Sequence, residues 1–321
     1  MTTMHCTIRH LCCGLLILAT IPAVGCKPLQ INNLSDRLRP SNARHWSPEH
    51  SILPYAVVQD DTIELHNIRN INYLSDEDFV VKHYDRTIQL SDVQSIDFVA
   101  TPFNSAPLLA HTMLSFGLSD GSHIGLSVEI RNENGEKYSP LLGIGNQFEV
   151  TYVIADEKDL IRVRTNHRDS DVYVYPSVAT PQQAQELFVD VLTRVNELNA
   201  KPEFYNTFYN NCTTNLVGHV NQLKTGRVPF NFKVLLPGFS AKYAYDIGLL
   251  DNRIPFEDLK NLAHVNDLVE QHYNDDDFSQ KIRSGRYRIE RLVNRQNARQ
   301  PTIDSTGGQF LEDNQLSLIH I

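Results

Sequence analysis

The sequence lacks the short motifs that mark several common enzyme classes. It has no phosphate-binding P-loop, no GxGxxG turn and no HExxH pair, so nucleotide binding and zincin chemistry have no motif to support them. Basic residues are in deficit, with 29 Lys and Arg against 38 Asp and Glu and a formal net charge of −9. A chain that repels phosphate overall is poorly suited to binding nucleic acid, and we expect no nucleic-acid partner.

Long apolar runs and dense charge are absent as well. The 321 residues are 41% hydrophobic and 21% charged, a balance that excludes both a disordered chain and a polytopic membrane protein. A chain of this length can bury a large core. We therefore expect one large domain with a tail.

Cysteine is scarce in most of the chain. Four of the five cysteines lie within the first 26 residues, and the fifth is Cys212. Arg9, an apolar run over residues 11–21 and the small residues Ala23-Val24-Gly25-Cys26 have the layout of a secretory signal. The last four resemble a bacterial lipobox, in which cleavage precedes a lipid-modified cysteine.

We therefore predict a signal peptide over residues 1–25 and lipidation of Cys26, with ordinary cleavage nearby as the alternative. The apolar run is shorter than the roughly 20 residues that a bilayer span requires, which disfavours an uncleaved anchor. Cleavage leaves Cys212 as the one thiol of the folded domain, so a disulfide framework within the chain is not expected. We expect the protein at the bacterial cell envelope, on the periplasmic side, anchored to the membrane through this lipid.

Apolar periodicity predicts an α+β fold, with an antiparallel sheet and packed helices. Residues 26–50 are polar and contain prolines, and we expect them to form a tether. Over residues 51–252 short alternating runs predict strands, and the period then changes to that of two helices, at 181–198 and from Asn210-Asn211 to Leu223. We expect residues 253–321 to be a helical extension that ends in a loose tail.

Cys212 stands just inside the predicted start of the second helix. Backbone N–H groups at a helix start lack partners and the helix dipole is positive there, so the thiolate is favoured and the pKa of the thiol should fall. This position predicts a nucleophile. The alternative is a buried small hydrophobe, which is what most free cysteines are.

A nucleophilic cysteine needs a base, and thirteen histidines are available. We favour His111, in a predicted strand, over its rival His123. A hairpin turn centred on Asp120-Gly121 places His111 opposite Ile130 or Arg131 and about 25 Å from His123, so the two histidines do not share one site.

The same hairpin predicts a third member of the site. If its loop has three residues, His111, Glu129 and Arg131 share one face of the sheet, and Glu129 can orient the imidazole. The alternative is that Glu129 and Arg131 form a surface pair. No spacing indicates a metal site, and we expect no cofactor.

Separated motifs follow one another in an order that is typical of one family. They include Ile52-Leu53-Pro54-Tyr55-Ala56, Ala110-His111-Thr112, Ser127-Val128-Glu129-Ile130-Arg131, Pro202-Glu203-Phe204-Tyr205-Asn206 and Asn211-Cys212-Thr213-Thr214. Over about residues 45–250 the chain resembles the N-terminal periplasmic domain of the Lnb-type lipoprotein N-acyltransferases.

The resemblance implies a circularly permuted fold of the NlpC and lecithin:retinol acyltransferase type, a papain-like thiol-enzyme core with histidine first on a strand and cysteine later at a helix start. It implies acyl transfer through a thioester on Cys212, with His111 as base and a membrane lipid or lipoprotein as acyl donor. The residues expected to support the oxyanion or the substrate are Thr213, Asn211, Arg131 and Tyr205.

Two other functions remain open on the sequence. The same chemistry fits a cysteine peptidase or amidase that acts on cell-wall peptides, and a third hypothesis is a non-catalytic envelope lipoprotein in which Cys212 is merely buried. An apolar groove beside Cys212 would favour acyl transfer, a polar open cleft would favour peptides, and a blocked thiol would favour a binding module.

Overall fold

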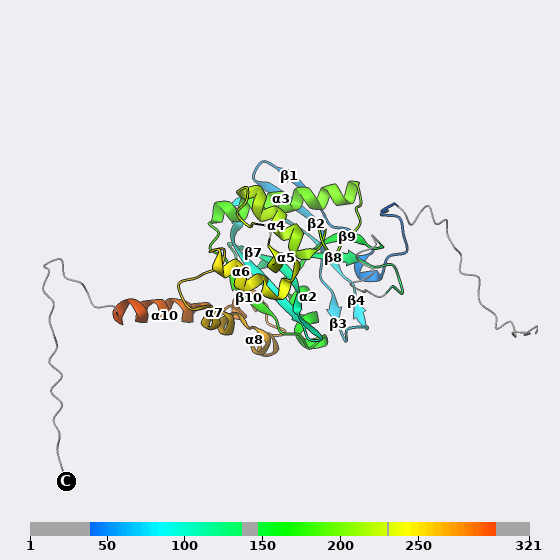
Figure 1. The fold of residues 1–321 in the computed structure, drawn as a ribbon. Helices are drawn as coiled ribbons and strands as arrows, with labels where there is room; N and C mark the ends of the chain where they lie inside the picture. The colour runs from blue at the N-terminus through cyan, green and yellow to red at the C-terminus, as the bar shows by residue number, and fades with distance from the viewer. Residues whose placement is uncertain (1–38, 137–146, 230, 300–321) are drawn as a thin grey trace, which may run out of the picture. The chain divides into compact units, whose positions relative to one another are not determined.

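The computed structural model describes residues 39–136, 147–229 and 231–299 (Figure 1). Contacts group the chain from Pro40 onward into one compact unit. The predicted signal peptide, Cys26 and the predicted tail after residue 299 lie outside the described residues. No helix in the described ranges is long and apolar enough to cross a membrane.

The centre of the fold is an eight-stranded sheet with the order β1-β2-β9-β8-β7-β6-β10, in which β5 pairs with β2. Its ladders are antiparallel except for one parallel pair between β2 and β9. This arrangement confirms the predicted α+β class with a mostly antiparallel sheet. The strands are β1 Tyr55–Gln59, β2 Thr62–Arg69, β5 His83–Gln89, β6 Val93–Phe103, β7 Ala106–Leu118, β8 His123–Arg131, β9 Glu149–Asp156 and β10 Tyr173–Pro176, with β3 Asn72–Tyr73 and β4 Phe79–Val80 forming a separate small sheet.

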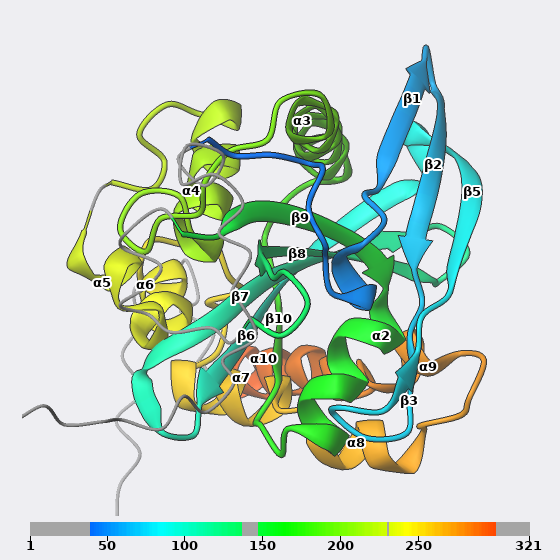
Figure 2. The ribbon, with the colours of Figure 1, turned by 90° about the vertical axis from the view of Figure 1, so that its right-hand side faces the viewer.

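Helices cover both faces of this sheet (Figure 2). α3 and α4 lie on one side of the central strands, and α2, α7 and α8 lie on the other. The α-helices are α2 Glu157–Arg162, α3 Pro181–Ala200, α4 Cys212–Leu223, α5 Phe232–Leu235, α6 Ser240–Asp246, α7 Phe256–Ala263, α8 Asn266–Gln271, α9 Phe278–Lys281 and α10 Arg286–Arg299. The 3₁₀ helices are η1 Pro48–His50, η2 Leu90–Asp92 and η5 Pro237–Phe239, and η4 Val163–His167 is a π-helix.

The long helix α3 forms where the sequence predicts it. Thr180 caps its start in a capping box with Gln183, and Pro181 occupies the first turn, where its missing N–H costs nothing. Its apolar stripe is buried against the sheet, with the rings of Phe188 and Phe116 in β7 4.8 Å apart. The buried stripe confirms the predicted positions Ala184, Leu187, Phe188, Val191, Leu192, Val195 and Leu198.

Alternation along β7 divides the core into two layers. Leu114 and Phe116 pack in the cluster that contains α3 and Cys212 of α4, whereas Met113 packs with Leu160 of α2 on the opposite face. Successive strand residues point to opposite faces. His111 therefore shares a face with Met113, and Thr112 shares a face with α4.

Residues 40–50 correct one predicted boundary. They were expected in the tether, but they pack on the domain: Asn42 Nδ2 donates to Asn199 O in α3 at 2.8 Å, and Ser47 N donates to Asn132 O just after β8. His50 is buried. The polar side chains of this segment form hydrogen bonds with the domain. Composition alone cannot distinguish a segment whose polar groups bind the domain from one whose polar groups bind water.

The segment after residue 252 also contributes to the core. Val269 and Phe278 are fully buried beneath the face that carries Met113. Arg283 inserts its guanidinium between Asp97 and Glu157, with Nε 2.7 Å from Asp97 Oδ2 and Nη1 2.8 Å from Glu157 Oε2. Burial would raise the pKa of Glu157, but the charge of Arg283 outweighs it and lowers this pKa to about 2.

Replacing Arg283 by Met should therefore destabilise the protein by about 3–5 kcal/mol, because the carboxylate of Glu157 stays buried without its arginine and Asp97 keeps Arg286 alone. Arg86→Met is the matched control. It removes an ion pair to Asp120, whose side chain is 58% exposed, and should cost about 1 kcal/mol or less. Urea unfolding of both variants measures the difference, and equal costs would contradict this account of the C-terminal segment.

Candidate active site

Cys212 is the first residue of α4, as the sequence predicts. The Asn211 side chain accepts from Thr214 N at 2.9 Å, and Thr214 Oγ1 accepts from Asn211 N at 2.9 Å. This capping box satisfies the third amide of the helix. Within the described residues, the amides of Cys212 and Thr213 have no hydrogen-bond acceptor, so they are available to bind an oxygen anion.

The thiol and His111 line the same cavity. Its volume is about 410 Å³, and it is open to solvent. Cys212 is 8% exposed, so the thiol is buried in the domain but reachable through this cavity. The wall also includes Tyr205 and Asn211, as the sequence hypothesis requires, and the apolar side chains Leu109, Val128, Ile130, Val163, Leu235 and Pro237.

The hairpin that carries His111 has the three-residue loop on which the hypothesis of a shared face depends. Leu118 N donates to Ser122 O across residues 119–121. The β7–β8 ladder then runs from Gly117–His123 to Met113–Ser127. Extending this register places His111 opposite Glu129. The predicted cross-strand partners of His111, Ile130 or Arg131, were therefore wrong by one or two residues. The pairing of β7 with β8 starts directly at the three-residue loop, which sets the register.

A serine connects His111 to Glu129. His111 Nε2 lies 2.7 Å from Ser127 Oγ, and Ser127 Oγ donates to Glu129 Oε1 at 2.7 Å. Since the Ser127 hydroxyl donates its proton to Glu129, Ser127 Oγ can only accept a hydrogen bond from His111. His111 Nε2 therefore carries the imidazole proton and donates to Ser127. This tautomer leaves the lone pair on Nδ1, where a base needs it.

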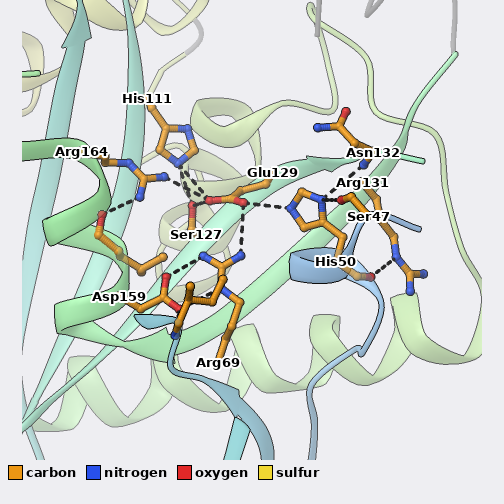
Figure 3. A network of polar contacts seen from close by, with 12 residues as sticks. Ser47, His50, Arg69, His111, Ser127, Glu129, Arg131, Asn132, Asp159 and Arg164 are labelled. Carbon is orange, nitrogen blue, oxygen red and sulfur yellow. Dashed lines mark hydrogen bonds and ion pairs between the residues drawn. The ribbon is translucent and has the colours of Figure 1, made fainter. Parts of the chain in front are cut away.

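Glu129 is the centre of a buried polar network (Figure 3). Arg164 Nη2 donates to Glu129 Oε1 at 3.1 Å, His50 Nε2 lies 3.3 Å from Oε2, and Arg69 Nη1 lies 3.9 Å from Oε2. Burial would raise the pKa of Glu129, but the hydrogen bond from His50 and the charges of Arg69 and Arg164 hold it well below its ordinary value. Glu129 is therefore a fixed negative charge.

The imidazole of His111 is kept neutral by the same surroundings. Burial, followed by the positive charge of Arg164, lowers the pKa of His111 to about 3, although the carboxylate of Glu129 acts in the opposite direction. A neutral imidazole at physiological pH is able to accept a proton.

The nucleophile and the base approach the cavity from opposite faces of β7. Thr112, on the α4 side, has its hydroxyl 3.1 Å from that of Thr213, whereas His111 points toward Ser127. The β7–β8 ladder ends at Met113–Ser127, and the cavity opens beside this end. No hydrogen bond joins Cys212 Sγ to an imidazole among the residues that the structure describes.

Other predicted site residues lie elsewhere. Arg131 does not line the cavity: its guanidinium stacks on Trp46, with Cζ 4.1 Å from the ring centroid, and donates to His50 O and Asn42 Oδ1. This also corrects the alternative of a surface pair with Glu129, because Arg131 is 3% exposed. Thr213 faces Thr112 and a different cavity.

His123 lies outside the cavity of Cys212. It pairs with Gly117 beside the turn, and its Nε2 lies 3.8 Å from Asp97 Oδ2 on the face that holds Arg283. The structure therefore separates the two candidate histidines, as the hairpin argument predicts.

Sequence reasoning missed three partners of Glu129 in the network. His50 was placed in the tether, and Arg69 and Arg164 stand at the end of β2 and in η4, far apart along the chain. The spacing of Arg164-Thr165 from Glu129 along the chain does not predict that the side chains of Arg164 and Glu129 meet. Only the parallel contact of β2 with β9 and the packing of η4 bring these side chains together.

Residues 80–238 match the family model of the Lnb N-terminal periplasmic domain. The chain belongs to this family. The matched range contains His111, Ser127, Glu129 and Cys212, whereas His50 and Arg69 precede it. Membership of this periplasmic domain family identifies the protein as a bacterial envelope protein on the periplasmic side. No curated protein and no solved structure matches the chain.

The Lnb domain holds no cluster of three or more His, Cys, Asp or Glu side chains suited to a metal ion within the described ranges. Its cavity brings together the thiol of Cys212, the imidazole of His111 and the charged network around Glu129.

The electrostatic account of His111 predicts how it titrates. In the wild-type protein, histidine-selective NMR should find the His111 imidazole neutral down to about pH 4. Arg164→Gln removes a positive charge that opposes protonation, so the pKa of His111 should rise by about one unit. Arg194→Gln, which instead breaks an ion pair with Glu203, should leave it unchanged. A wild-type His111 that titrates near pH 6.5 would contradict this account.

Proposed function

We propose that the protein is a thiol-dependent acyltransferase of the bacterial envelope, with the acyl group held as a thioester on Cys212 and His111 as the base. The observation that carries this proposal is that a thiol at a capped helix start and an imidazole hydrogen-bonded to Ser127 line one cavity. The order of histidine on a strand and cysteine at a later helix start supports a permuted NlpC-like or papain-like core.

The first half-reaction forms the thioester. His111 Nδ1 takes the proton of the Cys212 thiol, and the sulfur attacks the acyl carbonyl carbon of an ester. The C–S bond forms, the ester C–O bond breaks, and the leaving alcohol takes the proton back from the imidazolium. The two side chains close on each other when substrate binds, as catalytic contacts in free enzymes often do.

Two features of the site stabilise the charges that develop. The free amides of Cys212 and Thr213 point out of the start of α4 and can donate to the oxyanion of the tetrahedral intermediate. The imidazolium is stabilised through Ser127 by the carboxylate of Glu129. In the second half-reaction an amine attacks the thioester, the C–N bond forms and the C–S bond breaks, and His111 takes a proton from the amine and returns it to the sulfur of Cys212.

The wall of the cavity bears on the choice of substrate. The apolar residues around Cys212, among them Leu109, Leu235 and Pro237, favour an acyl chain. Arg69 and Arg164 line the same cavity, and this charged part favours the second candidate, an amidase that acts on cell-wall peptides. A thiol that lines an open cavity disfavours the non-catalytic alternative.

Cys212→Ser should abolish thioester formation, because the hydroxyl does not ionise at neutral pH, while the fold persists. Intact-protein mass spectrometry after incubation with phospholipid vesicles should find an acyl adduct on the wild type and none on the variant. His111→Ala should lower the rate of adduct formation by about 100-fold or more.

His123→Ala is the matched control for His111→Ala, since His123 lies outside the cavity, and should react at about the wild-type rate. An adduct that forms at the wild-type rate in His111→Ala would overturn the base assignment. Release of free amine or peptide from cell-wall fragments, without an acyl adduct from lipid, would favour the amidase.

The predicted lipid anchor has its own test. Cys26→Ala should prevent lipid attachment and release the protein from the membrane fraction, and activity on lipid in cells should fall because tethering raises the effective substrate concentration. Fractionation after fatty-acid labelling checks this. Undiminished cellular activity of Cys26→Ala would show that anchoring is not how the enzyme meets its substrate.

A further inference from the structure

A second cavity runs along α4 on the side away from Cys212. Its volume is about 230 Å³. The α4 residues in its wall are Thr213, Leu216, Val217, Val220, Leu223 and Lys224. These residues lie on one face of α4, from its second residue, Thr213, to Lys224 just after its end. At 1.5 Å per residue this face is about 16 Å long. The cavity is therefore elongated.

The wall of this cavity is mainly apolar. Leu114 and Ile96 form part of it from the sheet, and Leu187 of α3 and Val234 of α5 close it from the sides. All four are buried residues of the core. A surface of this kind favours a hydrocarbon, because each buried methylene contributes about 0.8 kcal/mol.

Positive charge gathers at one end of the cavity. Lys224 is exposed and marks where the cavity meets solvent, and Arg227 and Lys233 also line it. Lys233 lies 3.9 Å from Asp246 Oδ2, so Lys224 and Arg227 carry the positive charge available to a ligand. Arg227 donates to the carbonyls of Ile247 and Gly248, and neither it nor Lys224 forms an ion pair with a described carboxylate. Glu186 is the acidic residue of the wall, so the basic side chains exceed the acidic ones.

This cavity is separate from the cavity of Cys212. They share no wall residue: Cys212 and Leu235 line the first, whereas their neighbours Thr213 and Val234 line the second. The start of α4 and the short helix α5 form the partition between them. Occupation of the second cavity therefore does not require the thiol chemistry proposed for the first.

We propose that this second cavity binds a single-chain anionic amphiphile, such as a fatty acid or a lysophospholipid. The alkyl chain lies along α4 toward Thr213, and the carboxylate or phosphate lies at Lys224 and Arg227. Elongation selects an unbranched chain, the apolar wall desolvates it, and the basic end selects an anionic head group over a neutral one.

Calorimetric titration of the full-length Cys212→Ser protein tests this site without turnover. Dodecanoate should bind at least about tenfold more tightly than dodecanol, which has the same chain and no charge. Lysophosphatidylglycerol forms a further arm: if it binds more tightly than dodecanoate, a lipid head group is the natural source, and the reverse order indicates a free acid. Binding of neither anionic ligand would overturn the proposal.

Two variants locate the ligand. Lys224→Glu should weaken dodecanoate binding by about tenfold and leave dodecanol binding unchanged, whereas Lys201→Glu, an exposed lysine outside the cavity wall, should change neither. Val220→Trp should block the chain of both ligands. Circular dichroism checks the fold of each variant. Wild-type affinity for dodecanoate in folded Lys224→Glu would overturn the position of the head group, and wild-type affinity in folded Val220→Trp would overturn the position of the chain.

Discussion

The carboxylate of Glu129 is mostly withdrawn from solvent on β8, with its side chain 17% exposed, and a charge so placed is costly unless partners neutralise it. Its partners come from three distant parts of the chain: His50 before the sheet, Arg69 at the end of β2 and Arg164 after α2. Each of these segments must be in place for the charge to be tolerated. The position of the N-terminal segment, the parallel contact of β2 with β9 and the turn after α2 are therefore tied to one carboxylate.

This arrangement has a chemical consequence for His111. The same arginine that neutralises Glu129 also disfavours an imidazolium, and burial acts in the same direction. The base is kept neutral by the structure that orients it: Ser127 is hydrogen-bonded to both the imidazole and the carboxylate, and His111 Nε2 lies 4.0 Å from Glu129 Oε1. A neutral imidazole in the resting state has a free lone pair to offer the thiol.

Helix α4 separates two environments. Its first residue, Cys212, faces the cavity that contains the charged network, and the face from Thr213 to Lys224 lines an apolar cavity with a basic end. The helix is held from two sides, by the contact of Thr213 with Thr112 and by His219, which lies 2.8 Å from the hydroxyl of Tyr152 and 2.6 Å from Asp190. A ligand in either cavity would contact the helix whose start carries the thiol.

Sequence by itself determined the features that depend on neighbours along the chain. Local periods and turns account for three features. They predict the apolar stripe of α3, the cap at Asn211 that places Cys212 at a helix start, and the hairpin register that puts His111 and Glu129 on one face of the sheet. Tertiary structure alone decided the rest. His50, predicted in the tether, contacts Glu129, and Arg131 stacks on Trp46 instead of lining the cavity of Cys212. Thr213 lines the second cavity, not the one that Cys212 lines. These positions depend on contacts between residues far apart in the chain, which leave no period or spacing in the sequence.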